Sequence, residues 1–118
     1  MSAIADAVAM LEAAAKTVPG VEVSTDLGAA LNPPTVMIGP PQLSWDGYNV
    51  EPTEATFLVF VIVAFDDYAI EKLYQLVPQV AAALDANTDG SVRTAAPAVF
   101  QSGGHDYPAY EITCEVPL

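Results

Sequence analysis

The chain has 118 residues, of which 53% are hydrophobic and 15% charged, a composition that suits one folded domain with a real core and excludes low-hydrophobicity disorder. Fifteen acidic residues against three basic ones give a net charge of -12, which argues against an electrostatic grip on DNA phosphates or anionic lipid. The single cysteine, Cys114, excludes an intrachain disulfide, and without a Cys/His cluster no structural zinc is expected.

The sequence predicts neither a membrane span nor an export signal. The longest apolar run, from Phe57 to Phe65, is about half of the roughly 20 residues that a membrane helix needs. The amino terminus, MSAIADAVAML, has no basic residue and carries Asp6 where a signal peptide would place Lys or Arg. We therefore expect the chain to mature in the cytoplasm.

The first third of the chain contains one predicted helix and two short predicted strands. Residues 2–17 show the three- and four-residue apolar spacing of an amphipathic helix, with Ser2 as its N-cap and Pro19-Gly20 as its stop. Residues 21–24 alternate like a short strand, and residues 35–38 follow a turn-rich connection as a second strand.

The middle of the chain contains a predicted hairpin and the strongest predicted strand. Residues 43–45 and 48–50 flank Asp46-Gly47, a dipeptide that favours a type I′ turn, so we expect these two segments to pair. Residues 55–65 are aromatic and β-branched, with almost no polar residue on either face. They predict a central strand that needs cover on both sides.

A second amphipathic helix follows the central strand. Its apolar stripe runs from Ile70 to Leu84, and Asp66-Asp67 is the expected cap. Pro78 removes the hydrogen bond to the carbonyl of Tyr74, so it predicts either a kink at residues 74–77 or a separate short helix that begins at Pro78.

The last part of the chain predicts two more strands. Residues 91–100 are strand-like, with Pro97 as a marker of an edge or a bulge, and residues 110–116 alternate between apolar and polar side chains. We expect residues 101–108 to form a polar loop between them. The element order predicts one α+β domain over residues 1–118, with a mainly antiparallel curved sheet and two principal helices packed on one face.

Two helices can cover only one face of such a sheet. The second face of the central strand must therefore pack either on the curl and loops of its own sheet or on another protomer. We expect the chain to form an oligomer.

We predict no catalytic, cofactor or metal site. His105-Asp106 pairs an imidazole with a carboxylate, but neighbours in sequence rarely point at each other, and no nucleophile elbow is present. Asp66-Asp67 with Glu71 offers oxygen ligands for a hard cation, although helix capping explains the pair more simply. Gly103-Gly104 lacks the lysine of a phosphate loop, and Cys114 is expected to be a small core residue.

Aromatic residues gather in or beside the two long connections, where they act either as lids on the core or as anchors of an interface. The pattern alone does not separate these alternatives. We expect contacts between copies in segments 40–52 and 101–108. The candidate residues for an oligomer or partner interface are Trp45, Tyr48, Phe100, Tyr107 and Tyr110. An apolar chain without an active-site constellation is suited to burying surface against proteins, so we expect a structural protein and no enzyme.

The layout of the whole chain, rather than a short signature, carries a family resemblance. The segments are an Ala-rich first helix ending in VPGVEV, then PPTVMIGPP, ATFLVFVIVAFDD with AIEKLYQLVPQVAAAL, and the closing PAYEITCEVPL. Together they cover nearly all of the sequence, which resembles the tail terminators of long-tailed, siphovirus-type bacteriophages, in the form found in actinobacterial phages.

The resemblance implies a structural virion protein without cofactor or catalytic residues. It implies a ring of copies of the chain, usually six, at the head-proximal end of the tail, where the ring stops tail elongation and docks the head. The implied partners are the major tail tube protein and a head-completion or connector protein, with DNA passing through the ring without specific binding and no membrane involved. The acidic excess then suits the ring channel, for which the candidate residues are Asp46, Asp89 and Asp106.

Three alternatives remain open at the level of sequence. Another head-to-tail neck protein shares almost every feature, and gene order separates it from a terminator. An acidic inhibitor that mimics DNA needs its carboxylates along one exposed face, whereas here they are scattered along the sequence. An enzyme built around His105 would lose its activity in a His105→Ala variant.

Overall fold

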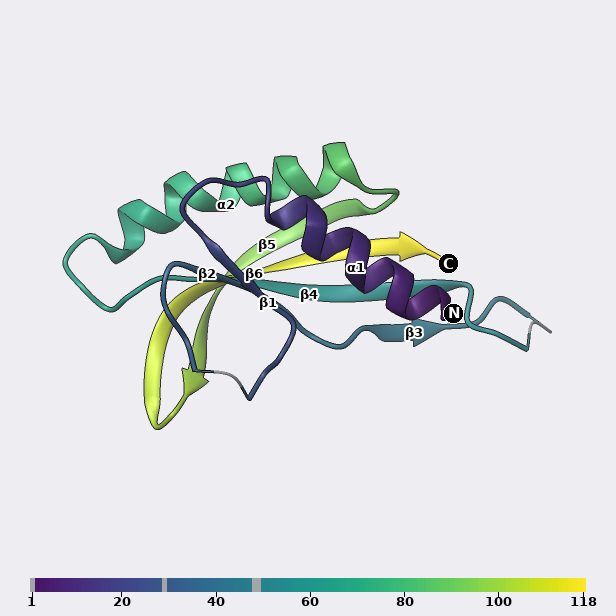
Figure 1. The fold of residues 1–118 in the computed structure, drawn as a ribbon, viewed down its shortest axis with the longest axis horizontal. Coiled ribbons are helices and arrows are strands. Elements are labelled where there is room, and N and C mark those ends of the chain that lie inside the picture. Colours follow the sequence, from purple (N-terminus) through teal and green to yellow (C-terminus); the bar gives the residue numbers. More distant parts are fainter. Residues whose placement is uncertain (1, 29, 48–49) are drawn as a thin grey trace.

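The computed structural model describes residues 2–28, 30–47 and 50–118 and has the predicted α+β architecture, with two helices on a six-stranded sheet that does not close (Figure 1). The elements in chain order are α1 (Ala3–Ala15), β1 (Glu22–Ser24), β2 (Thr35–Ile38), β3 (Gln42–Ser44), β4 (Glu54–Ile62), α2 (Ala69–Asn87), β5 (Ser91–Ser102) and β6 (His105–Pro117). The sheet is mainly antiparallel, as expected.

The sheet has the strand order β1-β2-β4-β6-β5, and β3 pairs with the beginning of β4 beside β2. Among the strands that the structure describes, only β1 and β2 pair in parallel. Strand β4 lies in the centre, where Val59 is opposite Ile38 of β2 and Ile112 of β6. Strand β5 is an outer strand, which confirms the prediction from Pro97, because a residue without a backbone N–H is tolerated best at an edge.

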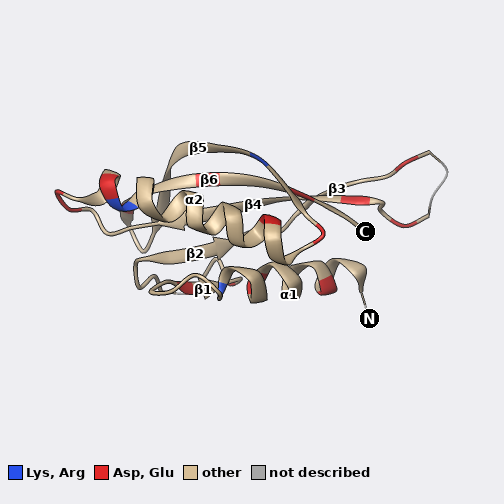
Figure 2. Ribbon diagram, turned by 90° about the horizontal axis from the view of Figure 1, so that it is seen from above, with Lys and Arg blue, Asp and Glu red and all other residues tan. Residues whose placement is uncertain are grey.

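Both helices lie on one face of the sheet, the helix face (Figures 1 and 2). Helix α1 begins at the predicted cap, where the Ser2 hydroxyl accepts a hydrogen bond from the Ala5 N–H at 3.3 Å. It lies against β1 and β2, while α2 lies against β4, β5 and β6. The main core is formed by alternate strand residues and the buried helix stripes, and includes Phe57, Val59, Val61, Ile112, Cys114, Leu11, Leu73, Val80 and Leu84.

The other face, the open face, is covered at one end by the protein's own chain. Met37, Ile62 and Ala109 are fully buried there beneath Leu31 of the β1–β2 connection and the aromatic rings of Phe60, Phe100 and Tyr107. The hairpin of β5 and β6 bends sharply at this end (Figure 1), and the Phe60 and Phe100 rings lie 5.2 Å apart between centroids. Of the two alternatives for this face, the curl and loops of the sheet therefore supply cover for this part of β4.

The hairpin predicted around Asp46-Gly47 has a different second strand. Strand β3 pairs with β4, with Ser44 opposite Glu54, so residues 45–53 form the connection. The prediction of a strand over residues 48–50 is wrong for Val50, because this residue lies in a bend. Tyr48 and Asn49 lie outside the described residues. The segment after Glu54 is a longer and more continuous run of aromatic and β-branched residues than residues 48–50, so it supplies the better partner for β3.

The predicted polar loop at residues 101–108 is also wrong. Strands β5 and β6 continue to Ser102 opposite His105, and Gly103 and Gly104 form the two-residue turn with φ of +58° and +78°. Two successive positive φ values define a type I′ turn, which glycine adopts without steric cost. The Gly-Gly pair therefore closes a long hairpin, in which polar side chains can face solvent.

Helix α2 differs from its prediction at its start. Its N-cap is Tyr68, and the Asp66 carboxylate instead accepts a hydrogen bond from the Tyr68 N–H at 2.8 Å in the preceding turn. Ile70 is exposed rather than part of the buried stripe, because Ala69 takes the core position. The helix runs through Pro78 as one element, so no separate helix begins there.

Candidate assembly surfaces

The predicted interface aromatics do not form one surface. Phe100 and Tyr107 are half-buried in the cluster on the open face, and Tyr110 packs against the main core on the helix face. All three residues therefore pack on the core of their own chain. Trp45 differs, because its side chain is exposed, and Tyr48 lies outside the described residues.

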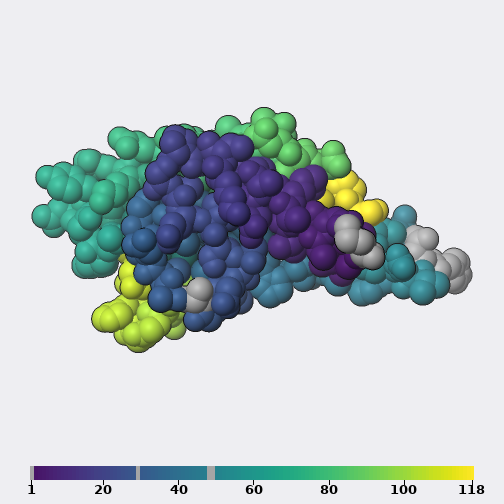
Figure 3. All heavy atoms as spheres, viewed as in Figure 1, coloured from purple at the N-terminus to yellow at the C-terminus, as the bar shows by residue number. Residues whose placement is uncertain are grey.

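Trp45 belongs to a projecting hairpin at one end of the molecule. The β3–β4 hairpin extends beyond the body of the domain (Figures 1 and 3). The Trp45 indole N–H donates a hydrogen bond to the Val50 carbonyl at 3.2 Å, so the two residues are held together across the connection. Trp45 is 51% exposed and Val50 94%. We call this pair the hairpin end.

A second exposed apolar group lies where β4 passes into α2, at the opposite end of the long axis from the β3–β4 hairpin (Figure 1). Phe65 is 86% exposed, and Phe65 and Val99 border a hollow of about 260 Å³ with Tyr107, Pro108 and Asp106. Further exposed side chains follow on the start of α2. We call the whole group the α2 end; its members are Phe65, Tyr68, Ile70, Tyr74 and Val99.

Sequence reasoning missed the α2 end because it placed Phe65 in the central strand and Ile70 in the buried stripe. Strand β4 ends at Ile62, opposite Thr35 and Ala109, and the chain leaves the sheet three residues before Phe65. An uninterrupted apolar run does not reveal where its neighbouring strands end. The helix periodicity could have indicated part of this surface. Tyr74 lies four residues after Ile70, so the two side chains lie on the same flank of α2.

The three candidate channel acids lie apart. Asp46 is in the β3–β4 hairpin, Asp89 in the connection between α2 and β5, and Asp106 near the tip of the β5–β6 hairpin. The two hairpins point to opposite ends of the molecule, and acidic residues occur on both helices and several connections (Figures 1 and 2). One copy of the chain therefore does not gather these acids on one surface.

All three basic residues are neutralised within the chain. The Lys16 ammonium lies 3.3 Å from the Glu12 carboxylate, Lys72 lies 2.9 Å from Asp66, and the Arg93 guanidinium lies 3.2 Å from Glu115. The Lys72 ammonium, together with the Tyr68 N–H, holds the pKa of Asp66 below its usual value. No lysine or arginine is left to attract an anionic partner, so the exposed surface has a negative field.

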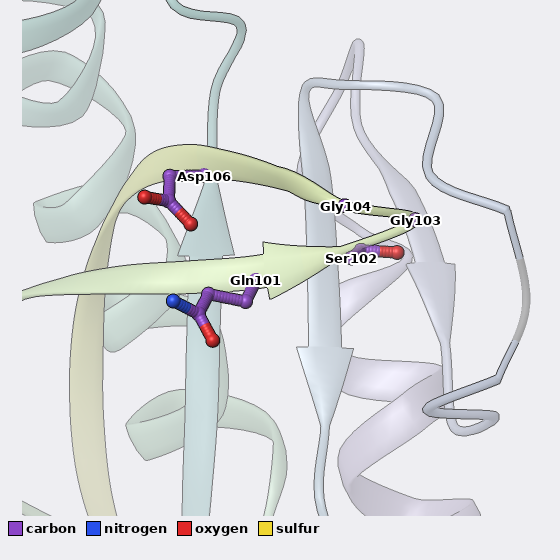
Figure 4. Close-up of a pocket in the computed structure, with 5 residues that line it drawn as sticks. All are labelled: Gln101, Ser102, Gly103, Gly104 and Asp106. Atoms are coloured by element: carbon purple, nitrogen blue, oxygen red, sulfur yellow. The ribbon is translucent and has the colours of Figure 1, made fainter.

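The residues considered for catalysis do not converge. His105 and Asp106 are successive residues of β6 and therefore point to opposite faces, and the His105 ring instead lies 6.5 Å from that of Tyr107. Gln101 and Asp106 face a hollow of about 310 Å³ at the hairpin tip (Figure 4). Within residues 2–28, 30–47 and 50–118, no three His, Cys, Asp or Glu side chains are grouped to hold a metal ion.

Cys114 is a buried core residue on the helix face. Burial raises the pKa of its thiol from 9.0 to about 11, and the negative charges of Asp85 and Glu115 add to the effect. A raised folded-state pKa stabilises the fold below pH 9, and this contribution is lost as the pH rises from 9 towards 11.

We expect the native chain to resist thiol labelling. At pH 8 the raised pKa lowers the thiolate fraction of Cys114 roughly 100-fold, and burial blocks the reagent as well. Labelling with iodoacetamide, followed by mass spectrometry, should proceed only in denaturant. Native labelling at the rate of a free thiol would show that Cys114 is accessible.

Comparisons with known proteins add no relative: no family model matches the chain, and no curated protein has significant similarity to it. Among the described residues, no helix is long and apolar enough to span a membrane. The class that the fold and surfaces define is a small acidic α+β domain with apolar side chains exposed at both ends.

Proposed function

We propose that the chain is a tail terminator of a long-tailed bacteriophage. In this role, copies of the chain form a ring on the head-proximal end of the tail tube. The family resemblance implies that the ring contains six copies. The ring stops tube growth and provides the surface on which the head docks. Its partners are the tail tube protein on one side and a head-completion or connector protein on the other, and its place is the virion.

The observation that carries the proposal is the exposure of apolar side chains at two opposite ends of an elongated domain of 51 × 30 × 23 Å. Monomeric soluble proteins rarely expose groups of large apolar residues, and such groups mark interaction sites. Two separate surfaces suit a subunit that has neighbours on both sides. The resemblance of the whole chain to tail terminators indicates which assembly this would be, a ring at the end of a phage tail.

The negative field supports a role beside DNA. A ring channel that carries acidic side chains lets DNA pass without adhering, because phosphates and carboxylates repel. Asp46, Asp89 and Asp106 are the candidate channel residues. Because they lie apart in one copy, we propose that at least one of them, contributed once by every copy, lines the channel. Single substitution of each by Lys should slow DNA ejection for at least one of them, and normal ejection by all three variant phages would contradict this part of the proposal.

A neck protein of another kind remains the alternative, because it also needs two protein-binding surfaces and tolerance of DNA. A DNA mimic is less well supported, since the acidic residues are spread over both ends and both helices instead of one face (Figure 2).

Tail length separates the two neck roles. We expect phages in which this gene carries a nonsense codon to produce tail tubes of unregulated, excessive length without heads, and electron microscopy measures both. Supplying the chain in trans should restore uniform tails. Tails of normal length together with heads that lack a connector would instead identify a head-completion protein.

A further inference from the structure

We propose that copies of this chain associate head to tail, with the hairpin end of one copy seated on the α2 end of the next. The inference rests on the proposed function, because it names the contact between neighbours in the ring. It commits to a second copy of the chain as the occupant of the α2 end. The shape, area and charge of the two ends support this contact.

The hairpin end is built to project. Among the described residues, the last pair between β3 and β4 is Ser44 with Glu54, and Trp45 lies directly beyond it. The hydrogen bond from the Trp45 indole to the Val50 carbonyl holds these two residues together and leaves both side chains exposed. Tryptophan is among the residues most enriched at energetically dominant interface positions. An ordered, exposed tryptophan on a projecting hairpin fits insertion into a neighbour.

The α2 end offers a receiving surface of suitable size. The 260 Å³ hollow beside Phe65 and Val99 provides a concave site, and Ile70 and Tyr74 add exposed apolar side chains on the start of α2. The exposed parts of the five side chains amount to roughly 600 Å², at the upper limit of about 300–600 Å² for the largest apolar patch of a monomer. A standard interface buries about 800 Å² per partner, so this surface supplies most of the area that one contact needs.

The placement of the two ends determines the kind of assembly. They lie at opposite ends of the longest axis of the domain (Figures 1 and 3), so a contact between them joins unlike surfaces. Such a heterologous contact leaves one free end of each kind on every pair of copies, so further copies add to it. The product is a ring if the rotation between neighbours closes and an open filament if it does not. A symmetric dimer would need each surface to contact its own copy.

The two surfaces carry charge of the same sign, so the contact between them must be stabilised by burial of apolar side chains. Both surfaces are flanked by acidic residues, and the three cations of each copy are already paired. The flanking acids are Asp46, Glu51, Asp66, Asp67 and Glu71, and Asp106 lines the hollow of the α2 end itself. Copies therefore repel at long range, and added salt should strengthen their association by screening this repulsion. A contact made by ion pairs would show the opposite salt dependence.

Two variants and their mixture test the contact. Trp45→Asp removes the inserting side chain, and Phe65→Asp introduces a charge into the receiving surface; both positions are exposed, so folding should be retained. Leu27→Asp, at an exposed apolar residue in the β1–β2 connection, is the matched control. Sedimentation velocity up to about 1 mM chain, at low and high salt, measures the mass of each species.

We expect the unaltered chain and Leu27→Asp to assemble, more strongly at high salt, and each end variant alone to remain monomeric. Mixing Trp45→Asp with Phe65→Asp should give a one-to-one dimer and nothing larger, because one intact end of each kind remains. Unchanged assembly in both variants would overturn the inference, as would a monomeric unaltered chain. A mixture that forms the dimer while tail length is normal in the nonsense phage would leave the inference standing and reject the terminator function.

Discussion

Phe57→Ala is expected to lower the free energy of unfolding by about 3–5 kcal/mol, the usual cost of emptying a fully buried aromatic site. Among the described residues, Phe57 is the largest completely buried side chain, and it lies on β4 opposite Cys114, between the sheet and the two helices. Strands on both sides and a helix layer above hold the site open, so the surrounding structure cannot collapse fully into the cavity. Since small domains are stable by about 5–15 kcal/mol, this one change removes a large part of the total.

Leu58→Ala is the matched control for this prediction. Leu58 is the next residue of the same strand, but it points to the open face and is exposed. Its truncation should cost less than about 1 kcal/mol. Urea unfolding followed by circular dichroism gives both values, and equal losses at the two positions would contradict the assignment of the helix face.

Gly90→Ala should destabilise the fold by about 1–3 kcal/mol, the range for overfilling a packed core. Gly90 lies in the tight connection from α2 into β5, where its N–H donates to the Thr88 hydroxyl at 2.9 Å. A Cβ atom here would lie 2.9 Å from the Cys114 sulfur and 3.1 Å from both the Thr88 hydroxyl and a Val116 methyl group. These neighbours are closely packed, so the backbone must shift.

The double variant Gly90→Ala, Cys114→Ala isolates the cause. Removal of the sulfur relieves the closest contact, so the two losses should sum to more than the loss of the double variant. Gly39→Ala is the control, because a Cβ atom there would meet only the Leu58 carbonyl at an ordinary 3.5 Å. Strict additivity in thermal or urea unfolding would show that the Cys114 contact is not the source of the strain.

The sequence was sufficient for the fold wherever side-chain periodicity decides the structure. The alternation through Phe57, Val59 and Val61 and the stripe from Leu73 to Leu84 predicted the helix face correctly. Binary patterns report burial reliably in the middle of elements, because neighbouring turns or strands repeat the same environment. Element ends lack this repetition, and the errors at Asp66 and at residues 101–108 both lie there.

The candidate surfaces were only half predictable. Trp45, predicted as either a lid or an interface anchor, is exposed, whereas Phe100 and Tyr107 needed the bend of the β5–β6 hairpin to become part of the core. Phe65 was missed since its exposure depends on where the pairing of β4 with β2 and β6 ends, which is a property of pairing between distant segments. Long-range pairing leaves no mark in a local window of sequence.

Cryo-electron microscopy of the head–tail joint in the phage that encodes this chain tests the central claim most directly. We predict a closed ring of this chain at the head-proximal end of the tail tube, with Trp45 of each copy against Phe65 of its neighbour and acidic side chains along the channel. A ring built from a different chain at that position would contradict the account.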